Sequence, residues 1–206
     1  MTTMSKSRIC GLLTVVALVC GCDKETNETK VEGKAVDSQS SIVALETGMG
    51  NIVIQLDRQA APVTTKNFLE YVQAGFYDGT VFHRVISGFM IQGGGFTADL
   101  QRKATRSPIV NEAWNGRSNT RGTIAMARTS DPNSATSQFF INHKENPPLD
   151  YADSAHPGYA VFGHVTQGMD VVDAIAAVKT STQNGMKDVP VEPVIIKSAK
   201  VVPQQK

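Results

Sequence analysis

Cysteine is scarce in this sequence, and its placement is uneven. All three cysteines, Cys10, Cys20 and Cys22, lie near the start of the chain, and none follows. The rest of the chain therefore offers no thiol for a disulfide, for a zinc site built on thiolates or for a covalent nucleophile.

A large charge of one sign is also missing. The formal net charge is +1 over 206 residues, so no strong field exists to attract nucleic acid or an anionic membrane surface. We therefore expect no nucleic-acid partner. Hydrophobic residues make up 41% of the chain, which suits one domain with a core. No heptad or long apolar stripe indicates an oligomer, so we expect a monomer.

Common catalytic motifs are lacking as well. The four histidines are His83, His143, His156 and His164. None is spaced four residues from another or lies in an HExxH-type pattern, so we expect no metal site and no cofactor. Ser87 and Ser137 lie in motif-rich stretches but without a GxSxG-type elbow, which disfavours a serine hydrolase.

The longest apolar run, residues 9–20, is shorter than the roughly 20 residues that a membrane-spanning helix needs. Basic residues precede it and small residues follow, which is typical of a bacterial export signal over residues 1–22. The Gly-Cys ending resembles a lipobox, which implies a lipid anchor on Cys22; ordinary signal cleavage nearby is the alternative. We thus expect an exported protein at the periplasmic face of the envelope, lipid-anchored or else soluble in the periplasm.

Residues 23–40 are polar and charged, which predicts a flexible tether. The folded domain is expected over 41–203, followed by a short tail at 204–206. The patterns within the domain predict these elements: a hairpin of strands 42–46 and 51–56, a helix that begins at Pro62 and ends before Gly75, short strands at 80–85, 90–93, 122–126, 138–141 and 160–164, a helix at 169–178, and a closing strand at 194–202. Many strands with two helices favour a closed antiparallel barrel.

The stretch FHRVISGFMIQGGGF, residues 82–96, carries a lone Arg84 in an apolar strand. A buried guanidinium without partners is very costly, so Arg84 either forms a structural salt bridge or points into a cleft as a donor. The three consecutive glycines at 93–95 favour a turn or a close backbone approach over a phosphate cradle, because no Lys-Ser/Thr follows them.

Several motifs together resemble the cyclophilins, the cyclosporin-binding class of peptidyl-prolyl isomerases. They are FHRVI at 82–86, GFMIQGG at 88–94, GTIAMA at 122–127, SQFFI at 137–141 and VFG at 161–163. The resemblance covers residues 42–202. It is greatest to the periplasmic type of bacterial cyclophilin, which shares NTRG at 119–122 and ATSQ at 135–138.

The resemblance implies a mainly β fold, a closed eight-stranded antiparallel barrel capped by two α-helices. It implies catalytic roles for Arg84, Phe89 and Gln92, with Arg84 donating hydrogen bonds to the prolyl region. It also implies a substrate-binding set made of Met90, Met126, Ala127, Arg128, Gln138, Phe140, Pro148, Leu149 and Tyr159. By residue type alone, Phe89, Met90 and Phe140 would more readily be barrel core.

The chain departs from the cyclosporin-sensitive eukaryotic members at the groove. Pro148 stands where they carry Trp, and Tyr159 where they carry His; the pair Arg128-Thr129 replaces the usual Asn-Ala. Pro148 removes an indole donor and a large apolar plane. We therefore expect weak cyclosporin binding with catalysis retained.

The function that follows is prolyl cis-trans isomerisation in exported or envelope proteins, with proline-containing peptides and unfolded proteins as partners. A non-catalytic chaperone or scaffold that holds proline-containing segments is the rival, and an altered Arg84 would have favoured it. A secreted hydrolase that uses Ser137 and a histidine is a third, weaker alternative.

Overall fold

The computed structural model describes residues 41–203 of the chain. The predicted signal, the lipidation at Cys22, the tether and the tail lie outside these residues. The elements are β1 (Ile42–Thr47), β2 (Gly50–Leu56), α1 (Pro62–Gln73), β3 (Thr80–Ile86), β4 (Met90–Thr97), β5 (Thr123–Met126), β6 (Phe139–Asn142), β7 (Val161–Gln167), α2 (Met169–Ala176), β8 (Thr180–Gln183), β9 (Met186–Pro190) and β10 (Ile195–Val202), with short 3-10 turns at Ala113–Asn115 and Pro147–Leu149.

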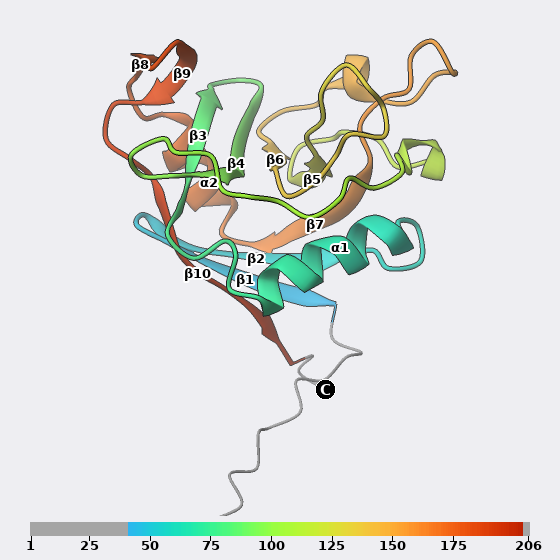
Figure 1. The fold of residues 1–206 in the computed structure, drawn as a ribbon, viewed down its shortest axis with the longest axis horizontal. Coiled ribbons are helices and arrows are strands. Elements are labelled where there is room, and N and C mark those ends of the chain that lie inside the picture. Colours follow the sequence, from blue (N-terminus) through green and yellow to red (C-terminus); the bar gives the residue numbers. More distant parts are fainter. Residues whose placement is uncertain (1–40, 204–206) are drawn as a thin grey trace, which may run out of the picture. The chain divides into compact units, whose positions relative to one another are not determined.

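Eight of the strands form a closed antiparallel barrel in the order β1-β10-β3-β4-β6-β5-β7-β2 (Figure 1). The predicted fold class is thereby confirmed. Every second side chain of a strand points into the barrel: in β1, Val43 and Leu45 are fully buried while the residues next to them are less buried. Closure also leaves these strands no free edge for another chain to pair with.

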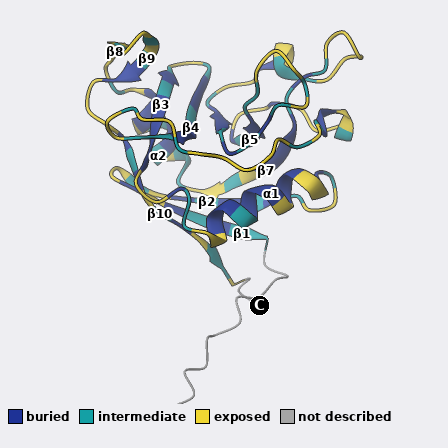
Figure 2. Ribbon diagram, viewed as in Figure 1, coloured by how far each residue is buried: buried dark blue, intermediate teal, exposed yellow. Residues whose placement is uncertain are grey.

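The two helices complete the interior. The main core cluster combines inward-facing strand residues with Phe68 and Val72 of α1 and with Val172 and Ile175 of α2. Figure 2 shows the buried face of α1 turned towards the strands and its opposite face exposed. Aromatic rings fill the space where α1 meets the barrel, among them Phe68 and Phe139, whose ring centroids lie 5.6 Å apart at an interplanar angle of 89°.

Helix α1 has an N-terminal cap that comes from far along the chain. Pro62 suits the first helical turn, but Ala61 offers no side chain to the free backbone N–H groups. Instead the buried carboxylate of Glu112 accepts hydrogen bonds from Val63 N and Thr64 N at 3.1 and 2.8 Å. A negative charge at this helix end is also favoured by the helix dipole.

The hairpin of β8 and β9 was not predicted from the sequence. Thr180, Ser181 and Thr182 of β8 are exposed, so the strand has none of the apolar alternation that marks a half-buried strand. The hairpin lies outside the barrel and beside β3 (Figure 1). Val189 and Pro190 at its end are buried and hold it in place.

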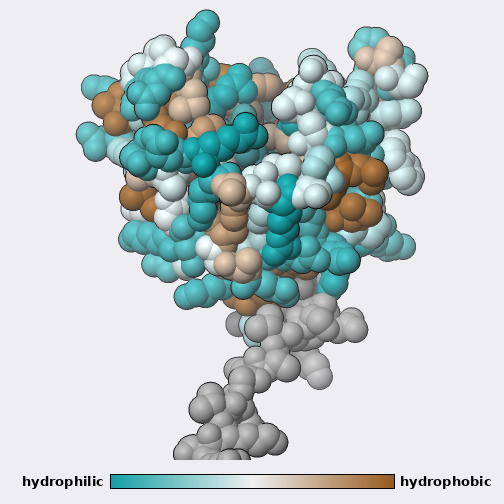
Figure 3. Space-filling view, in the orientation of Figure 1, coloured by the Kyte–Doolittle hydropathy of each residue, from teal (hydrophilic) through white to brown (hydrophobic). Residues whose placement is uncertain are grey.

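The surface in Figure 3 is largely hydrophilic, with hydrophobic residues in small separate groups on the visible face. Among residues 41–203, no helix is long and apolar enough to cross a membrane. In the same part of the chain, no three His, Cys, Asp or Glu side chains gather closely enough to hold a metal ion.

Candidate active site

A cavity of about 110 Å³ lies on the outside of the barrel, and we call it the groove. Its lining residues are Arg84, Phe89, Met90, Gln92, Ala127, Arg128, Phe140, Leu149 and Tyr159. All nine belong to the predicted site. They come from β3, β4 and β6, from the turn between β3 and β4, and from the segments that follow β5 and precede β7.

Strand register explains why these residues share one face. Arg84 pairs with Gln92, Gln92 with Phe140, and Phe140 with Ala125 across four neighbouring strands. Directly opposite residues of paired strands project to the same side of a sheet. The sheet thereby forms a row of outward-facing side chains, with the guanidinium at one end and small or aromatic residues at the other.

A β-bulge turns Arg84 outward. Phe82 pairs with Gly93 and Arg84 pairs with Gln92. Between these two pairs β3 therefore contains one extra residue that has no partner on β4. Phe82 is fully buried in the barrel core, while Arg84 lies on the groove. Phe82 and Arg84 are two residues apart, so in a regular strand their side chains would point to the same face; the bulge places them on opposite faces.

His83 is that extra residue, and its side chain does not line the groove. It is 4% exposed, lies against Phe96 with ring centroids 4.6 Å apart, and borders a small cavity under the β8–β9 hairpin. Its Nδ1 has no hydrogen-bond partner within residues 41–203. The pKa of His83 is lowered to about 4, mainly by burial; hydrogen bonds with Val81 and Gln138 oppose the shift, and the nearby charge of Arg84 adds to it.

The apolar part of the groove is separate from the barrel core. Met90 and Phe140, 2% and 4% exposed, cluster with Ala125 and Val161 outside the main core. Phe89, Leu149 and Tyr159 pack against this cluster and are partly exposed. Phe89, Met90 and Phe140 are therefore not residues of the barrel interior, which was the plainer interpretation of their type.

Arg84 has little to hold it. Its Nε lies 3.8 Å from Oδ2 of Asp188 on β9, and the two side chains are 43% and 41% exposed. Apart from this ion pair, the described part of the chain offers the side chain of Arg84 no hydrogen bond. The guanidinium is thus a donor at the groove rather than part of a satisfied buried salt bridge.

Gln92 is held by a neighbour that depends on the glycine run. Its Nε2 donates to Oε1 of Gln138 at 2.9 Å. A Cβ added at Gly95 would lie 2.5 Å from the Gln138 side chain, so only glycine allows that side chain its position. At Gly94 the backbone φ is +81° and a Cβ would meet Tyr77 and Phe139, which is a second reason for the run.

A network of asparagines sets the loop that carries Leu149. Asn119 donates to Leu149 O at 3.0 Å, Asn142 donates to Asn119, and Asn146 donates to Phe89 O at 3.0 Å. Asn119, Asn142 and Asn146 are all buried. Asn142 and Asn146 are four residues apart, but Asn119 is 23 residues from Asn142, and no pattern in the sequence predicts that the three side chains meet.

Two departures from the family pattern meet in one contact. The guanidinium carbon of Arg128 lies 4.4 Å from the centre of the Tyr159 ring, and its Nε donates to Gly158 O at 3.0 Å. Tyr159 in turn packs edge-on against Phe140, with ring centroids 5.7 Å apart. Arg128 therefore stiffens one wall of the groove through its side chain as well as through its backbone.

Three residues of the predicted set do not line the groove. Met126 follows Ala125 on β5, so it faces inward and belongs to the barrel core. Gln138 lines an adjoining cavity and reaches the groove through Gln92. Pro148 is exposed beside Leu149. The functional roles assigned to the whole set, and the weak binding of cyclosporin, stay predictions.

Ser137 has the surroundings of a structural residue. It is fully buried, and its hydroxyl donates to Gly94 O at 2.8 Å. A hydroxyl in this position has no access to a substrate, so the hydrolase alternative has no support in the structure.

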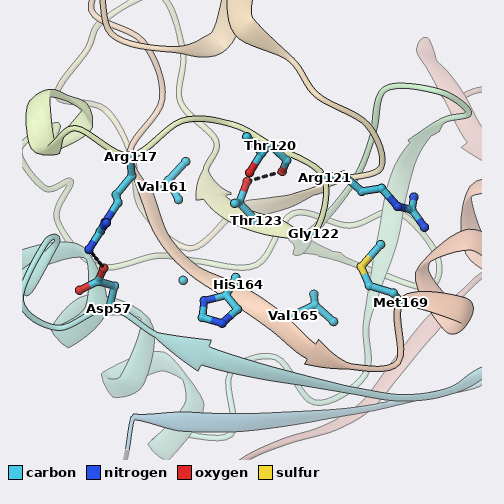
Figure 4. Close-up of a pocket in the computed structure, with 11 residues that line it drawn as sticks. Asp57, Arg117, Thr120, Arg121, Gly122, Thr123, Val161, His164, Val165 and Met169 are labelled. Carbon is cyan, nitrogen blue, oxygen red and sulfur yellow. Dashed lines mark hydrogen bonds and ion pairs between the residues drawn. The ribbon is translucent and has the colours of Figure 1, made fainter.

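A larger cavity of about 590 Å³ lies over β7 (Figure 4). Two arginines border it, and both have acidic partners: Arg117 contacts Asp57 at 2.7 Å and Arg121 contacts Asp173 at 2.8 Å. Burial raises the pKa of Asp57, but hydrogen bonds from Ala60 N and Arg117 lower it more, so the net shift is downward. In Figure 4, His164 lies between the Arg117–Asp57 ion pair and Arg121.

Comparison with known proteins agrees with the site. The sequence profile of the family described as "Cyclophilin type peptidyl-prolyl cis-trans isomerase/CLD" matches residues 42–201. The chain belongs to the cyclophilin family. A peptidyl-prolyl cis-trans isomerase of Streptomyces antibioticus is 58% identical over 164 residues, which are 79% of this chain and 99% of the relative. Peptidyl-prolyl cis-trans isomerase A of Dickeya dadantii is 48% identical over 199 residues, 97% and 99% of the two chains.

A solved cyclophilin has the same fold. The crystal structure of a Cryptosporidium parvum cyclophilin, determined in the presence of the dipeptide Ala-Pro, superposes with a TM-score of 0.68 at 27% identity and covers 79% of this chain and 99% of that one. The protein is thus a cyclophilin-type peptidyl-prolyl cis-trans isomerase, and proline-containing peptides are its class of ligand.

Proposed function

We propose that Arg84 accelerates prolyl isomerisation by stabilising the twisted amide, with the proline ring seated on the apolar part of the groove. The observation that carries this is the position of the guanidinium, beside Gln92 and at the edge of the cluster of Met90 and Phe140. Phe89 and Leu149 complete the seat.

The physical basis needs no nucleophile and no proton transfer. An amide resists rotation by about 18 to 20 kcal/mol because the nitrogen lone pair is delocalised into the carbonyl. In the twisted state that lone pair is localised, and the prolyl nitrogen becomes a better hydrogen-bond acceptor. A guanidinium placed there binds the transition state more tightly than either planar state, which lowers the barrier.

The other groove residues hold the peptide while the bond rotates. The side-chain amide of Gln92 and the backbone at Ala127 and Arg128 lie along the same face and supply polar contacts for an extended chain. Arg keeps its charge across physiological pH, and His83 remains neutral because its pKa is about 4. Turnover should therefore change little between pH 6 and pH 8.

The test is cis-trans exchange in a short Ala-Pro peptide, followed by NMR with the purified domain from Ser41 onward. We expect fast exchange, and a loss of at least tenfold in Arg84→Ala, about 1.4 kcal/mol of transition-state stabilisation. Arg84→Lys keeps a charge without the planar fork and should recover only part of the activity. Peptide binding without exchange in the unaltered domain would favour the chaperone or scaffold instead.

We further propose that the protein is exported and acts, as a lipid-anchored monomer, on envelope proteins. The basic residues, apolar run and Gly-Cys ending of residues 1–22 support this. Expression of the full chain in a Gram-negative host with an alkyne-tagged fatty acid should label the protein, and Cys22→Ser should abolish the label. Label that persists in Cys22→Ser would contradict the anchor.

A further inference from the structure

Arg84 has one charged neighbour that the sequence did not suggest, the carboxylate of Asp188. Arg84 and Asp188 are far apart in the chain and meet because the β8–β9 hairpin lies beside β3. Val189 and Pro190, which follow Asp188, border the cavity that His83 also lines. The hairpin is therefore fixed against the strand that carries Arg84, one residue away from it.

The backbone at Asp188 is unusual for the residue it carries. Asp188 has φ +61°, in the left-handed region that glycine occupies most easily. Between Met186 and Val189 the β9 strand contains one residue more than its partner, so Asp188 lies at a β-bulge. Bulges often redirect a side chain next to an active site.

Stability does not explain this arrangement. The two charges are 3.8 Å apart, beyond hydrogen-bond distance, and each side chain is more than two-fifths exposed. Exposed ion pairs of this kind contribute little to folding, while a left-handed backbone is unfavourable for residues other than glycine, although aspartate tolerates it better than most. An acidic residue at such a position, beside the guanidinium, points to a role in the groove.

We propose that Asp188 is a positioning residue for Arg84. This inference rests on the proposed function of Arg84. The bulge on β3 turns Arg84 outward, and the bulge on β9 directs the carboxylate at its Nε side. Electrostatic attraction to the carboxylate on that side biases the orientation of the long side chain and leaves its terminal nitrogens for the substrate. A pre-organised guanidinium loses less freedom when it binds the twisted amide.

Two variants separate the charge from the backbone. Asp188→Asn and Asp188→Gly both tolerate a positive φ, and both remove the carboxylate. We expect each to lower kcat by about threefold to tenfold on a neutral Ala-Pro peptide, with little change in KM, because the ground-state contacts of the seat are intact. Asn184→Gly is the matched control, since Asn184 also has a positive φ in this hairpin but is not paired with Arg84. It should have unchanged kcat.

A double-mutant cycle shows whether Asp188 acts through Arg84. In the Arg84→Ala background, adding Asp188→Gly should change kcat by less than a factor of 1.5. An equal loss in both backgrounds would mean that Asp188 acts independently of Arg84 and would overturn the proposal. A loss seen only with a peptide carrying Lys next to proline would mean direct contact with the substrate and would overturn it as well. Unchanged kcat in Asp188→Asn would overturn it too. Since the proposed function is judged on the unaltered protein and Arg84→Ala alone, its failure is distinguishable from this one.

Discussion

The groove and the cavity over β7 differ in what their arginines do. The cavity over β7 is about 590 Å³ and the groove only about 110 Å³. In the larger one each arginine is ion-paired at 2.7 to 2.8 Å, whereas Arg84 in the smaller one has a single distant partner. A cation that is already neutralised has little left for a ligand, so the size of a cavity does not identify the reactive site.

The largest effect should come from replacing the groove arginine by alanine, compared with the same replacement of an arginine in the cavity over β7. Arg84→Ala should lower kcat/KM at least tenfold, about 1.4 kcal/mol, while Arg121→Ala should leave it within a factor of two. Prolyl exchange by NMR on both variants is the measurement. A comparable loss in Arg121→Ala would mean that the β7 cavity takes part in catalysis and would remove the distinction.

A methyl group at Gly95 should have the next largest effect. Gly95→Ala forces the Gln138 side chain to move, and Gln92 loses the acceptor that holds its amide. We expect kcat/KM to fall about threefold to tenfold, roughly 1 kcal/mol. Gly48→Ala is the control, because its φ is not positive and no heavy atom lies within 4 Å of the added Cβ. Equal activity in the two variants would contradict the role given to Gln138.

The pH dependence of stability should expose His83. Its pKa is about 4 in the folded protein, below the 6.5 of an ordinary histidine. As pH falls from about 6.5 towards 4, the unfolded chain binds a proton at His83 that the folded protein does not, so the free energy of unfolding decreases, by at most about 1.4 kcal/mol per pH unit. Urea unfolding should show a smaller decrease for His83→Gln. Parallel pH curves for the two proteins would contradict the buried neutral state.

The smallest effect should come from removing an arginine that borders the cavity over β7. Arg117 is 55% exposed, so Arg117→Ala should cost less than about 1 kcal/mol of unfolding free energy at pH 7 and leave catalysis unchanged. Urea unfolding and prolyl exchange measure the two quantities.

By contrast Glu112→Ala, which leaves α1 without its cap, should cost about 1 to 3 kcal/mol of unfolding free energy. A larger loss for Arg117→Ala than for Glu112→Ala would reverse this order.

Much of the molecule could be predicted from local pattern. Alternating residues set β1 and β2, Pro62 marks the start of α1, and the motifs around Arg84, Gln92 and Phe140 indicate the groove. Parity along a strand accounts for Met126: it follows Ala125, which faces the groove, so its own side chain enters the core. That outcome needed the register of β5.

By itself, then, the sequence determined the barrel class, the family and most of the groove, because these depend on periodicity and on short motifs. The tertiary structure alone decided what holds the site in place: the cap from Glu112, the asparagine network behind Leu149, the two bulges, and the β8–β9 hairpin that carries Asp188 to Arg84. The physical reason is the same in each case. These contacts join residues distant in the chain, and a polar residue reveals its partner only when the fold brings the two together.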